Sequence, residues 1–314
     1  MRTLLFIFYL VVMAALTGLM GCVTPPPAPA PVVLPPVVVQ QPRVALVLGG
    51  GAARGFAHVG VIRALEQEKI PIDLVVGTSV GSLIGAIYAH DANSFELEWT
   101  AFSLEKGDLF DYTFLSASMG PVKGDKLEEF IRTKVAAANI EDLRIPFVAV
   151  ATDLNHGTRV ILDHGSLARA VRASCAIPGI FQPVAHQGRL LVDGGVIDNI
   201  PIEVARLRGA DIVIAVDISE NITNYNITNL VDVTMQAVSI MFKVNVGFRK
   251  HTADVLITPD VGGVGMTDFT QKKRSMQAGI DATRAALPAI HKAMADWIGK
   301  QSSVPVITKT NQEK

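Results

Sequence analysis

The stretch Ile72–Gly85, with the sequence IDLVVGTSVGSLIG, constrains the fold of this chain most strongly. The apolar run Leu74–Val76 predicts a buried strand, and the residues from Val80 onward have helical spacing. Ser79 lies between the two, within a glycine-rich segment that must turn sharply. A strand, a tight turn and a helix are therefore expected, as in α/β folds.

Such a turn lifts the hydroxyl of Ser79 off the edge of the sheet. Residues two before and two after the serine crowd each other, so only residues as small as Gly77 and Gly81 fit there. The helix starting at Val80 points free N–H groups and its positive dipole end at the space where an oxyanion would form. We interpret Ser79 as a nucleophile. The alternative is a glycine-rich turn whose serine only caps the helix.

Composition limits the possible functions. The chain has 314 residues, of which 49% are hydrophobic and 18% charged, which suits one large α/β domain or two small ones. A formal net charge of −1 gives no electrostatic footprint for nucleic acid, so no nucleic-acid partner is expected. The two cysteines and seven scattered histidines show no metal-ligand spacing. We expect no metal and no cofactor.

Residues 1–21 have the pattern of an export signal, with a positively charged start and the apolar run Leu4–Leu16, which is too short to span a bilayer comfortably. The run ends in Leu-Met-Gly-Cys, which resembles the lipobox of bacterial lipoproteins. That resemblance implies lipidation of Cys22 as a membrane anchor, and Val23 after it favours the outer membrane. An ordinary signal peptide with a chance cysteine is the alternative.

The rest of the chain divides by composition. The Pro-rich residues 22–42 predict an extended, semi-rigid linker. A single domain is expected over residues 43–300, with its motifs concentrated in residues 44–201, and the polar residues 301–314 predict a flexible tail.

A second strand, loop and helix start at Val44–Leu48, which is followed by Gly49–Gly55. The loop leaves several N–H groups unpaired, which could hold a pyrophosphate or a developing oxyanion. Asp73 precedes the second strand, whereas a dinucleotide site needs its acidic residue after that strand. We expect an oxyanion hole instead. Its predicted donors are the amides of Gly50, Gly51, Ala52 and Val80.

The predicted strand Arg189–Val192 leads into Asp193, and two glycines follow. They allow the backbone to turn sharply and to point the carboxylate toward Ser79. The alternative is an ordinary Asp-Gly hairpin turn. Earlier in the chain, the aromatic segment Leu109–Pro121 is either a flap over the site or a loop whose aromatic rings are buried in the core.

Four segments, LGGGAARGFAHVGVIRAL, VVGTSVGS, SCAIPGIFQPV and LVDGGVIDNIP, occur in the order and spacing seen in bacterial patatin-like phospholipases. The chain resembles that family strongly over Val44–Pro201 and more loosely up to Trp297. The resemblance implies a three-layer α/β sandwich with a mainly parallel central sheet flanked by helices. It also implies a Ser–Asp dyad that hydrolyses acyl esters of lipids, so that the expected substrate is a lipid.

Matched position by position, the resemblance makes Ser79 the nucleophile and Asp193 the dyad acid. Gly50 and Gly51, with Arg54 and Gly55, match the oxyanion motif. Ala52 stands where the family often has a third glycine, and its methyl group should leave the N–H free. Arg54 is expected to brace the loop or to meet a substrate phosphate, unless it is a simple surface arginine, and His58 is expected to be structural.

An aspartate near its usual pKa of ~3.9 is a poor base at neutral pH. The site must therefore raise that pKa by partial burial or rely chiefly on oxyanion stabilisation. Three other functions stay open: a transacylase that uses the same acyl-serine, a non-catalytic envelope lipoprotein, and a nucleotide-binding protein. The sequence does not predict the oligomeric state.

Overall fold

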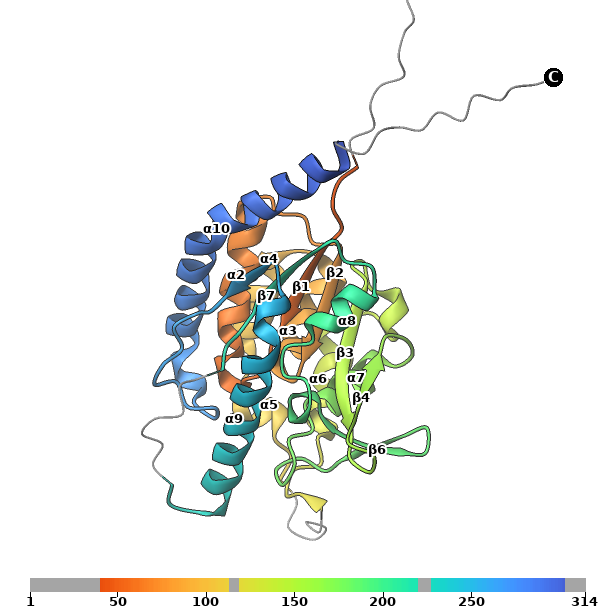
Figure 1. Ribbon diagram of the computed structural model, residues 1–314. Coiled ribbons are helices and arrows are strands. Elements are labelled where there is room, and N and C mark those ends of the chain that lie inside the picture. Colours follow the sequence, from red (N-terminus) through yellow and green to blue (C-terminus); the bar gives the residue numbers. More distant parts are fainter. Residues whose placement is uncertain (1–39, 113–118, 220–226, 303–314) are drawn as a thin grey trace, which may run out of the picture. The chain divides into compact units, whose positions relative to one another are not determined.

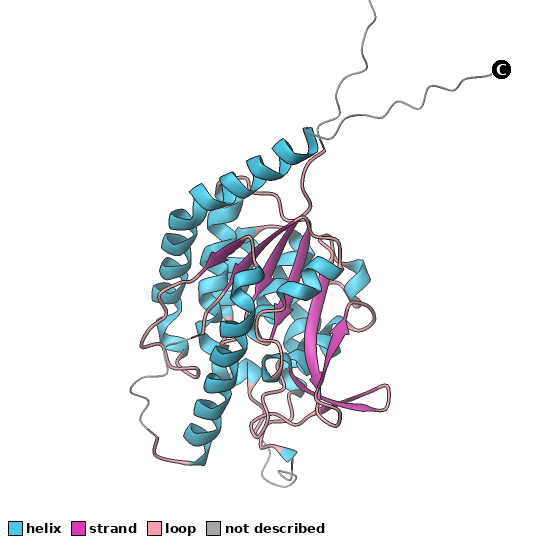
Figure 2. Ribbon diagram, in the orientation of Figure 1, coloured by secondary structure: helices cyan, strands magenta, loops and turns pink. Residues whose placement is uncertain are grey.

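The central sheet of this computed structural model lies between two layers of helices (Figures 1 and 2). The structure describes residues 40–112, 119–219 and 227–302. Its strands are β1 (Val44–Leu48), β2 (Leu74–Thr78), β3 (Phe147–Asp153), β4 (Thr158–Leu162), β5 (Val184–His186), β6 (Arg189–Asp193), β7 (Ile212–Val216) and β8 (Val255–Ile257). The predicted tail and the predicted leader and linker lie almost wholly outside the described residues.

The sheet has the order β5-β6-β3-β2-β1-β7-β8, and β4 also pairs with β3. The pairs β3-β2, β2-β1, β1-β7 and β7-β8 are parallel. The pairs β3-β4, β3-β6 and β5-β6 are antiparallel. All five residues of β1 are fully buried, as expected for a parallel strand covered on both faces. The mainly parallel three-layer fold predicted from the sequence is confirmed.

Alternate residues of each central strand belong to two separate hydrophobic cores, because successive side chains of a strand point to opposite faces of the sheet. Val44 and Leu46 belong to a large cluster on one face, while Ala45 and Val47 belong to a smaller cluster on the other. The helices are α2 (Phe56–Gln67), α3 (Val80–Asp91), α4 (Ser94–Ser103), α5 (Lys106–Leu109), α6 (Asp125–Lys134), α7 (Leu167–Ser174), α8 (Ile202–Leu207), α9 (Leu230–Arg249) and α10 (Lys272–Ser302). The large cluster includes residues of α2, α3, α7 and α10, and the smaller one those of α8 and α9.

Strand β1 lies at the position where the chain changes direction across the sheet. It pairs with β2 on one side and with β7 on the other, so the carboxyl ends of β1 and β2 lie side by side. Crevices at such positions are the usual binding sites of open α/β sheets. The glycine loop after β1 and Ser79 after β2 meet there.

Candidate active site

Ser79 lies on the turn between β2 and α3 with φ 54° and ψ −129°, a strained conformation for a residue with a side chain. Its side chain makes no capping hydrogen bond to the helix, which rules out the alternative of a purely capping serine. Its backbone N–H donates to Ser174 Oγ at 3.0 Å, and Ser174 Oγ donates to Val150 O at 2.7 Å. Ser174, which the sequence reasoning missed, therefore fixes this turn to β3.

Two glycines flank the turn because backbone atoms occupy the space of their side chains. A Cβ on Gly77 would lie 2.5 Å from Gly81 O, and a Cβ on Gly81 would overlap Leu48 O at the end of β1. The crowding predicted for this turn is therefore present. Gly81 also has to remain small for a reason that the sequence did not indicate, which is the approach of the neighbouring strand.

Replacing Gly81 with alanine should destabilise the protein by about 3 kcal/mol, because the new methyl group meets backbone that cannot rotate away. Chemical denaturation measures this effect. Gly299→Ala in α10 is a matched control, since nothing lies within 4 Å of its Cβ position, and it should be stabilising by up to about 1 kcal/mol. Equal effects of the two substitutions would contradict the close packing of this turn.

Asp193 ends β6 and is completely buried. A short 3-10 helix, Gly194–Val196, follows it, so the alternative of an Asp-Gly hairpin turn is wrong. Its Oδ1 accepts a hydrogen bond from Gly195 N at 2.8 Å, and its carbonyl accepts one from Thr152 Oγ1 at 2.9 Å. These bonds hold the carboxyl group in one orientation.

Burial raises the pKa of Asp193 from 3.8 to about 7, while interactions with the Ser79 side chain and the Gly195 amide act in the opposite direction. Its second oxygen, Oδ2, has no well-aligned hydrogen bond among the described residues. The Ser79 side chain is thus close enough to affect the carboxyl but does not form a well-aligned bond with it. Catalytic contacts of this kind commonly tighten when substrate binds.

The amide of Gly50 is not free in this structure. It donates to Asn199 Oδ1 at 3.2 Å and to Asn199 O at 3.3 Å, and Asn199 Nδ2 donates back to Gly50 O at 3.3 Å. The prediction of Gly50 as an oxyanion donor is therefore corrected: a buried asparagine uses its N–H. Asn199, six residues after Asp193, was missed because nothing in the sequence indicates its partner.

The amides of Gly51, Ala52 and Val80 have no hydrogen-bond partner within the described parts of the chain. Ala52 has φ 50°, a left-handed conformation that costs most residues about 1–2 kcal/mol and glycine very little. The position therefore favours glycine, although alanine adopts the same turn here. Ala52 and Val80 line the same pocket as Ser79.

Asn199→Ala should lower kcat about tenfold to a hundredfold with little change in KM, because Gly50 loses the side chain that fixes the loop beside Ser79. Steady-state kinetics on a soluble ester measures this. The exposed Asn155→Ala is the matched control and should behave as wild type. A KM effect without a kcat effect would contradict a role in positioning the loop.

Arg54 and Gly55 support the loop from behind. Arg54 is only 2% exposed, and its Nε donates to Val264 O at 2.8 Å, so it braces the loop and is no surface arginine. A Cβ on Gly55 would overlap the side chain of Val80, so this glycine allows the loop after β1 to pack directly on the start of α3. The two segments that carry the free amides are in direct contact.

His58 is fully buried in α2, and its Nε2 donates to Gly49 O at 2.8 Å. Burial lowers its pKa to about 4, so the ring is neutral at physiological pH. Burial also raises the pKa of the Cys175 thiol, which keeps it protonated. His58 therefore keeps a neutral ring and Cys175 a neutral thiol at physiological pH.

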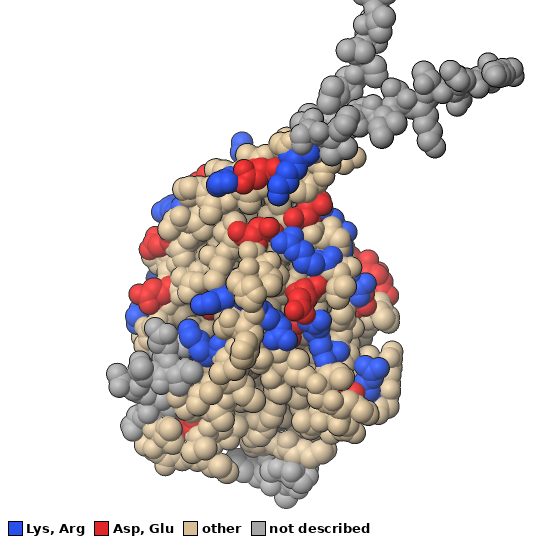
Figure 3. Space-filling view, in the orientation of Figure 1, with Lys and Arg blue, Asp and Glu red and all other residues tan. Residues whose placement is uncertain are grey.

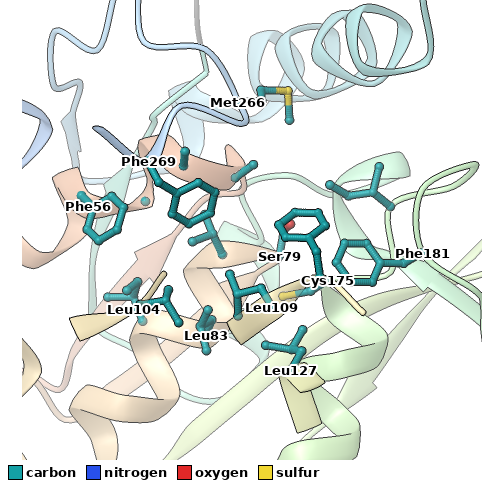
Figure 4. A pocket seen from close by; sticks show the side chains of 17 residues that line it. Phe56, Ser79, Leu83, Leu104, Leu109, Leu127, Cys175, Phe181, Met266 and Phe269 are labelled. Carbon is teal, nitrogen blue, oxygen red and sulfur yellow. The ribbon is translucent and has the colours of Figure 1, made fainter. Parts of the chain in front are cut away.

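An apolar pocket adjoins Ser79 (Figure 4). Of the described residues that line it, only Ser79 carries a hydroxyl group and only Cys175 a thiol. The other lining residues are Ala52, Ala53, Gly55, Phe56, Val80, Leu83, Ile84, Leu104, Leu109, Phe110, Leu127, Ile177, Phe181, Met266 and Phe269. Phe110 of the predicted flap is half-buried here, with its ring centroid 5.3 Å from that of Phe181. Phe114 lies outside the described residues. A lining of this kind suits a hydrocarbon chain.

Comparison with known proteins places the chain in a family. The family model described as patatin-like phospholipase matches residues 46–206. The chain therefore belongs to the patatin-like phospholipase family, as the sequence predicted.

Several curated proteins are similar to parts of this chain. It is 40% identical over 183 residues to patatin-like phospholipase domain-containing protein 6 of Mus musculus, which covers 56% of this chain and 13% of that protein. It is 36% identical over 187 residues to lysophospholipase NTE1 of Scheffersomyces stipitis, covering 58% and 12%. An uncharacterised NTE family protein of Mycobacterium tuberculosis is 38% identical over 191 residues, covering 61% and 53%. The match thus spans little more than half of these relatives at most.

Among solved structures, the crystal structure of VipD from Legionella pneumophila is similar, with a TM-score of 0.56 and 15% sequence identity. The similarity covers 80% of this chain and 67% of that one. At this identity it supports the fold alone.

Proposed function

We propose that this protein is a serine hydrolase of lipid acyl esters, in which Ser79 and Asp193 form the catalytic dyad. The observation that carries this proposal is the placement of a fully buried carboxyl group, with a pKa of about 7 and an unpartnered oxygen, next to Ser79. A base with a pKa near the working pH is the most effective for proton transfer. The raised pKa therefore allows Asp193 to act as the base near neutral pH without a histidine.

In the proposed reaction, Asp193 Oδ2 accepts the proton of Ser79 Oγ while that oxygen attacks the ester carbonyl carbon. The amides of Gly51, Ala52 and Val80 stabilise the resulting oxyanion, and each such donor contributes roughly 2.7–4 kcal/mol in the transition state. The tetrahedral intermediate collapses, and Asp193 returns the proton to the leaving alcohol oxygen. Water, deprotonated by the same carboxylate, then attacks the acyl carbon, and Asp193 returns the proton to Ser79 Oγ as the fatty acid leaves.

Incubating the purified protein with defined phospholipids and lysophospholipids tests this function. Free fatty acid and the deacylated lipid are the expected products, and a fluorophosphonate probe should label the peptide that contains Ser79. Transfer of the acyl group to an added alcohol, in place of release, would instead identify a transacylase. The absence of both labelling and products would refute the proposed chemistry and favour a non-catalytic lipoprotein.

We further propose that residues 1–21 are a lipoprotein-type signal peptide, that residues 22–42 are a linker with lipidated Cys22, and that the mature protein is held in the outer membrane of a bacterial envelope. No helix in the described part of the chain is long and apolar enough to cross a bilayer. Metabolic labelling with a fatty acid should mark the wild type but not Cys22→Ser. Labelling of both would refute this anchor.

A further inference from the structure

Helix α9 has two apolar faces. Its inner face consists of the buried residues Met235, Val238, Phe242 and Val246. Three of these, Met235, Val238 and Phe242, pack in one cluster with Ile177, Phe181 and Met266, which line the pocket beside Ser79. The inner face therefore packs behind part of the lining of the candidate active site.

The opposite face of α9 is unusual because no charged or polar residue occupies an exposed position from its start to Phe248. Leu230 is 80% exposed and Phe248 72% exposed. The charged residues Asp232, Lys243 and Arg249 occupy half-buried positions. The outer face of α9 consists of Leu230, Val233, Ala237, Ile240, Val244, Gly247 and Phe248.

An apolar stripe along a helix normally faces a core, and a contiguous apolar patch on a surface marks a site of interaction with a protein or a membrane. The stripe on α9 covers almost the whole helix, which is about 30 Å long at 1.5 Å per residue. Its most exposed positions are all apolar. Such a ridge is suited to lie in the interfacial region of a lipid layer.

Two observations favour lipid as the occupant. The inner face of the same helix packs against residues that line the pocket, so a lipid layer on its outer face would lie about one helix diameter, ~10 Å, from those residues. The surface around the lower end of α9 also carries few charged side chains: in Figure 3 most Lys, Arg, Asp and Glu residues lie on the upper part of the molecule. A surface of this composition binds neutral lipid without needing anionic head groups.

We propose that the outer face of α9 docks on the surface of an aggregated lipid, such as a membrane, and thereby holds the pocket at the lipid interface. The biological role of this surface rests on the proposed function, but the lipid binding that we predict does not depend on catalysis. Because the surface is uncharged, binding should be nearly independent of salt, unlike attraction through a basic patch.

The test uses the Ser79→Ala protein with Cys22→Ser, so that no lipid anchor contributes, and vesicles of pure phosphatidylcholine, with the bound fraction measured by flotation at low and high salt. Adding Val244→Gln and Phe248→Gln should weaken binding at least tenfold, because each removes an apolar side chain that would be buried in lipid. The matched control adds Phe95→Gln and Trp99→Gln on α4, which are 70% and 73% exposed. This control should bind as the Ser79→Ala protein does.

Equal loss of binding in both double variants, or unchanged binding in the α9 variant, would overturn the proposal. So would a stable dimer that the α9 substitutions dissolve while vesicle binding is absent, since a second copy of the chain would then be the partner. In the otherwise wild-type protein, the α9 substitutions should lower turnover of vesicle lipid and leave turnover of a dissolved short-chain ester unchanged. Salt-independent vesicle binding without any ester turnover would refute the proposed function but not the docking surface.

Discussion

Ser79→Ala should lower turnover of any acyl ester by about 10⁴-fold or more, because the proposed nucleophile is gone while the proposed oxyanion donors remain. The protein should still fold. The Ser79 side chain makes no capping hydrogen bond, and alanine can adopt the same strained backbone conformation at a similar cost. Initial rates on a soluble ester and labelling by a fluorophosphonate measure the loss.

The exposed Ser103→Ala in α4 is the control, and it should retain both activity and labelling. Thermal unfolding of the two variants should be alike. Residual turnover of Ser79→Ala within about a hundredfold of the wild type would show that another group attacks the ester, and the assignment of the nucleophile would then be wrong.

Turnover should fall about tenfold per pH unit below pH 7, because Asp193 with a pKa of about 7 must lose its proton to act as the base. Asp193→Asn cannot accept that proton, so its rate should be about 10²–10⁴-fold lower and should not show this acidic limb. The neutral His58, with a pKa of about 4, cannot produce a limb near pH 7. A pH–rate profile of both proteins on a soluble ester measures these effects.

The raised pKa of Asp193 also predicts that the free energy of unfolding changes with pH. Its pKa is raised from 3.8 to about 7 by folding, so its contribution to stability is fully present below about pH 4 and is lost as pH rises through 7. Asparagine has no charge to bury. The stability of Asp193→Asn relative to the wild type should therefore rise between pH 4 and pH 8 by up to about 4 kcal/mol.

Denaturant unfolding at pH 4.5 and pH 8 checks this expectation. Asp281→Asn, at an exposed position on α10, is the control and should show no such pH-dependent difference. A difference between Asp193→Asn and the wild type that is the same at both pH values would mean that the carboxyl is not held in a desolvated site.

The sequence predicted the parts of the site that depend on local chemistry. Leu74–Val76 is apolar and precedes the small residues that a tight turn requires, so the position of Ser79 followed from the pattern. The two glycines after Asp193 allowed a turn at the end of a strand. The apolar runs predicted individual buried strands, whereas the three-layer fold with a mainly parallel sheet was implied by the resemblance to patatin-like phospholipases.

What the sequence could not predict depends on partners brought together by folding. Asn199 and Gly50 are 149 residues apart, and nothing local indicates that one uses the amide of the other. The burial of Asp193, which sets its pKa, results from packing of several elements around β6. The exposed apolar face of α9 was also missed, because the sequence of an apolar 20-residue helix does not distinguish a buried face from an exposed one.

The contact of Gly55 with Val80 has a consequence for how the pocket of this protein could change to fit other ligands. Because Gly55 has no side chain, the loop after β1 packs directly on the side chain of Val80 at the start of α3. A larger residue at position 55 would push the two segments apart and so separate the amides that we propose act on the same oxygen. Phe110 and Phe181 also line the pocket but take no part in this contact, so their size can change the width of the pocket without changing the spacing of these amides.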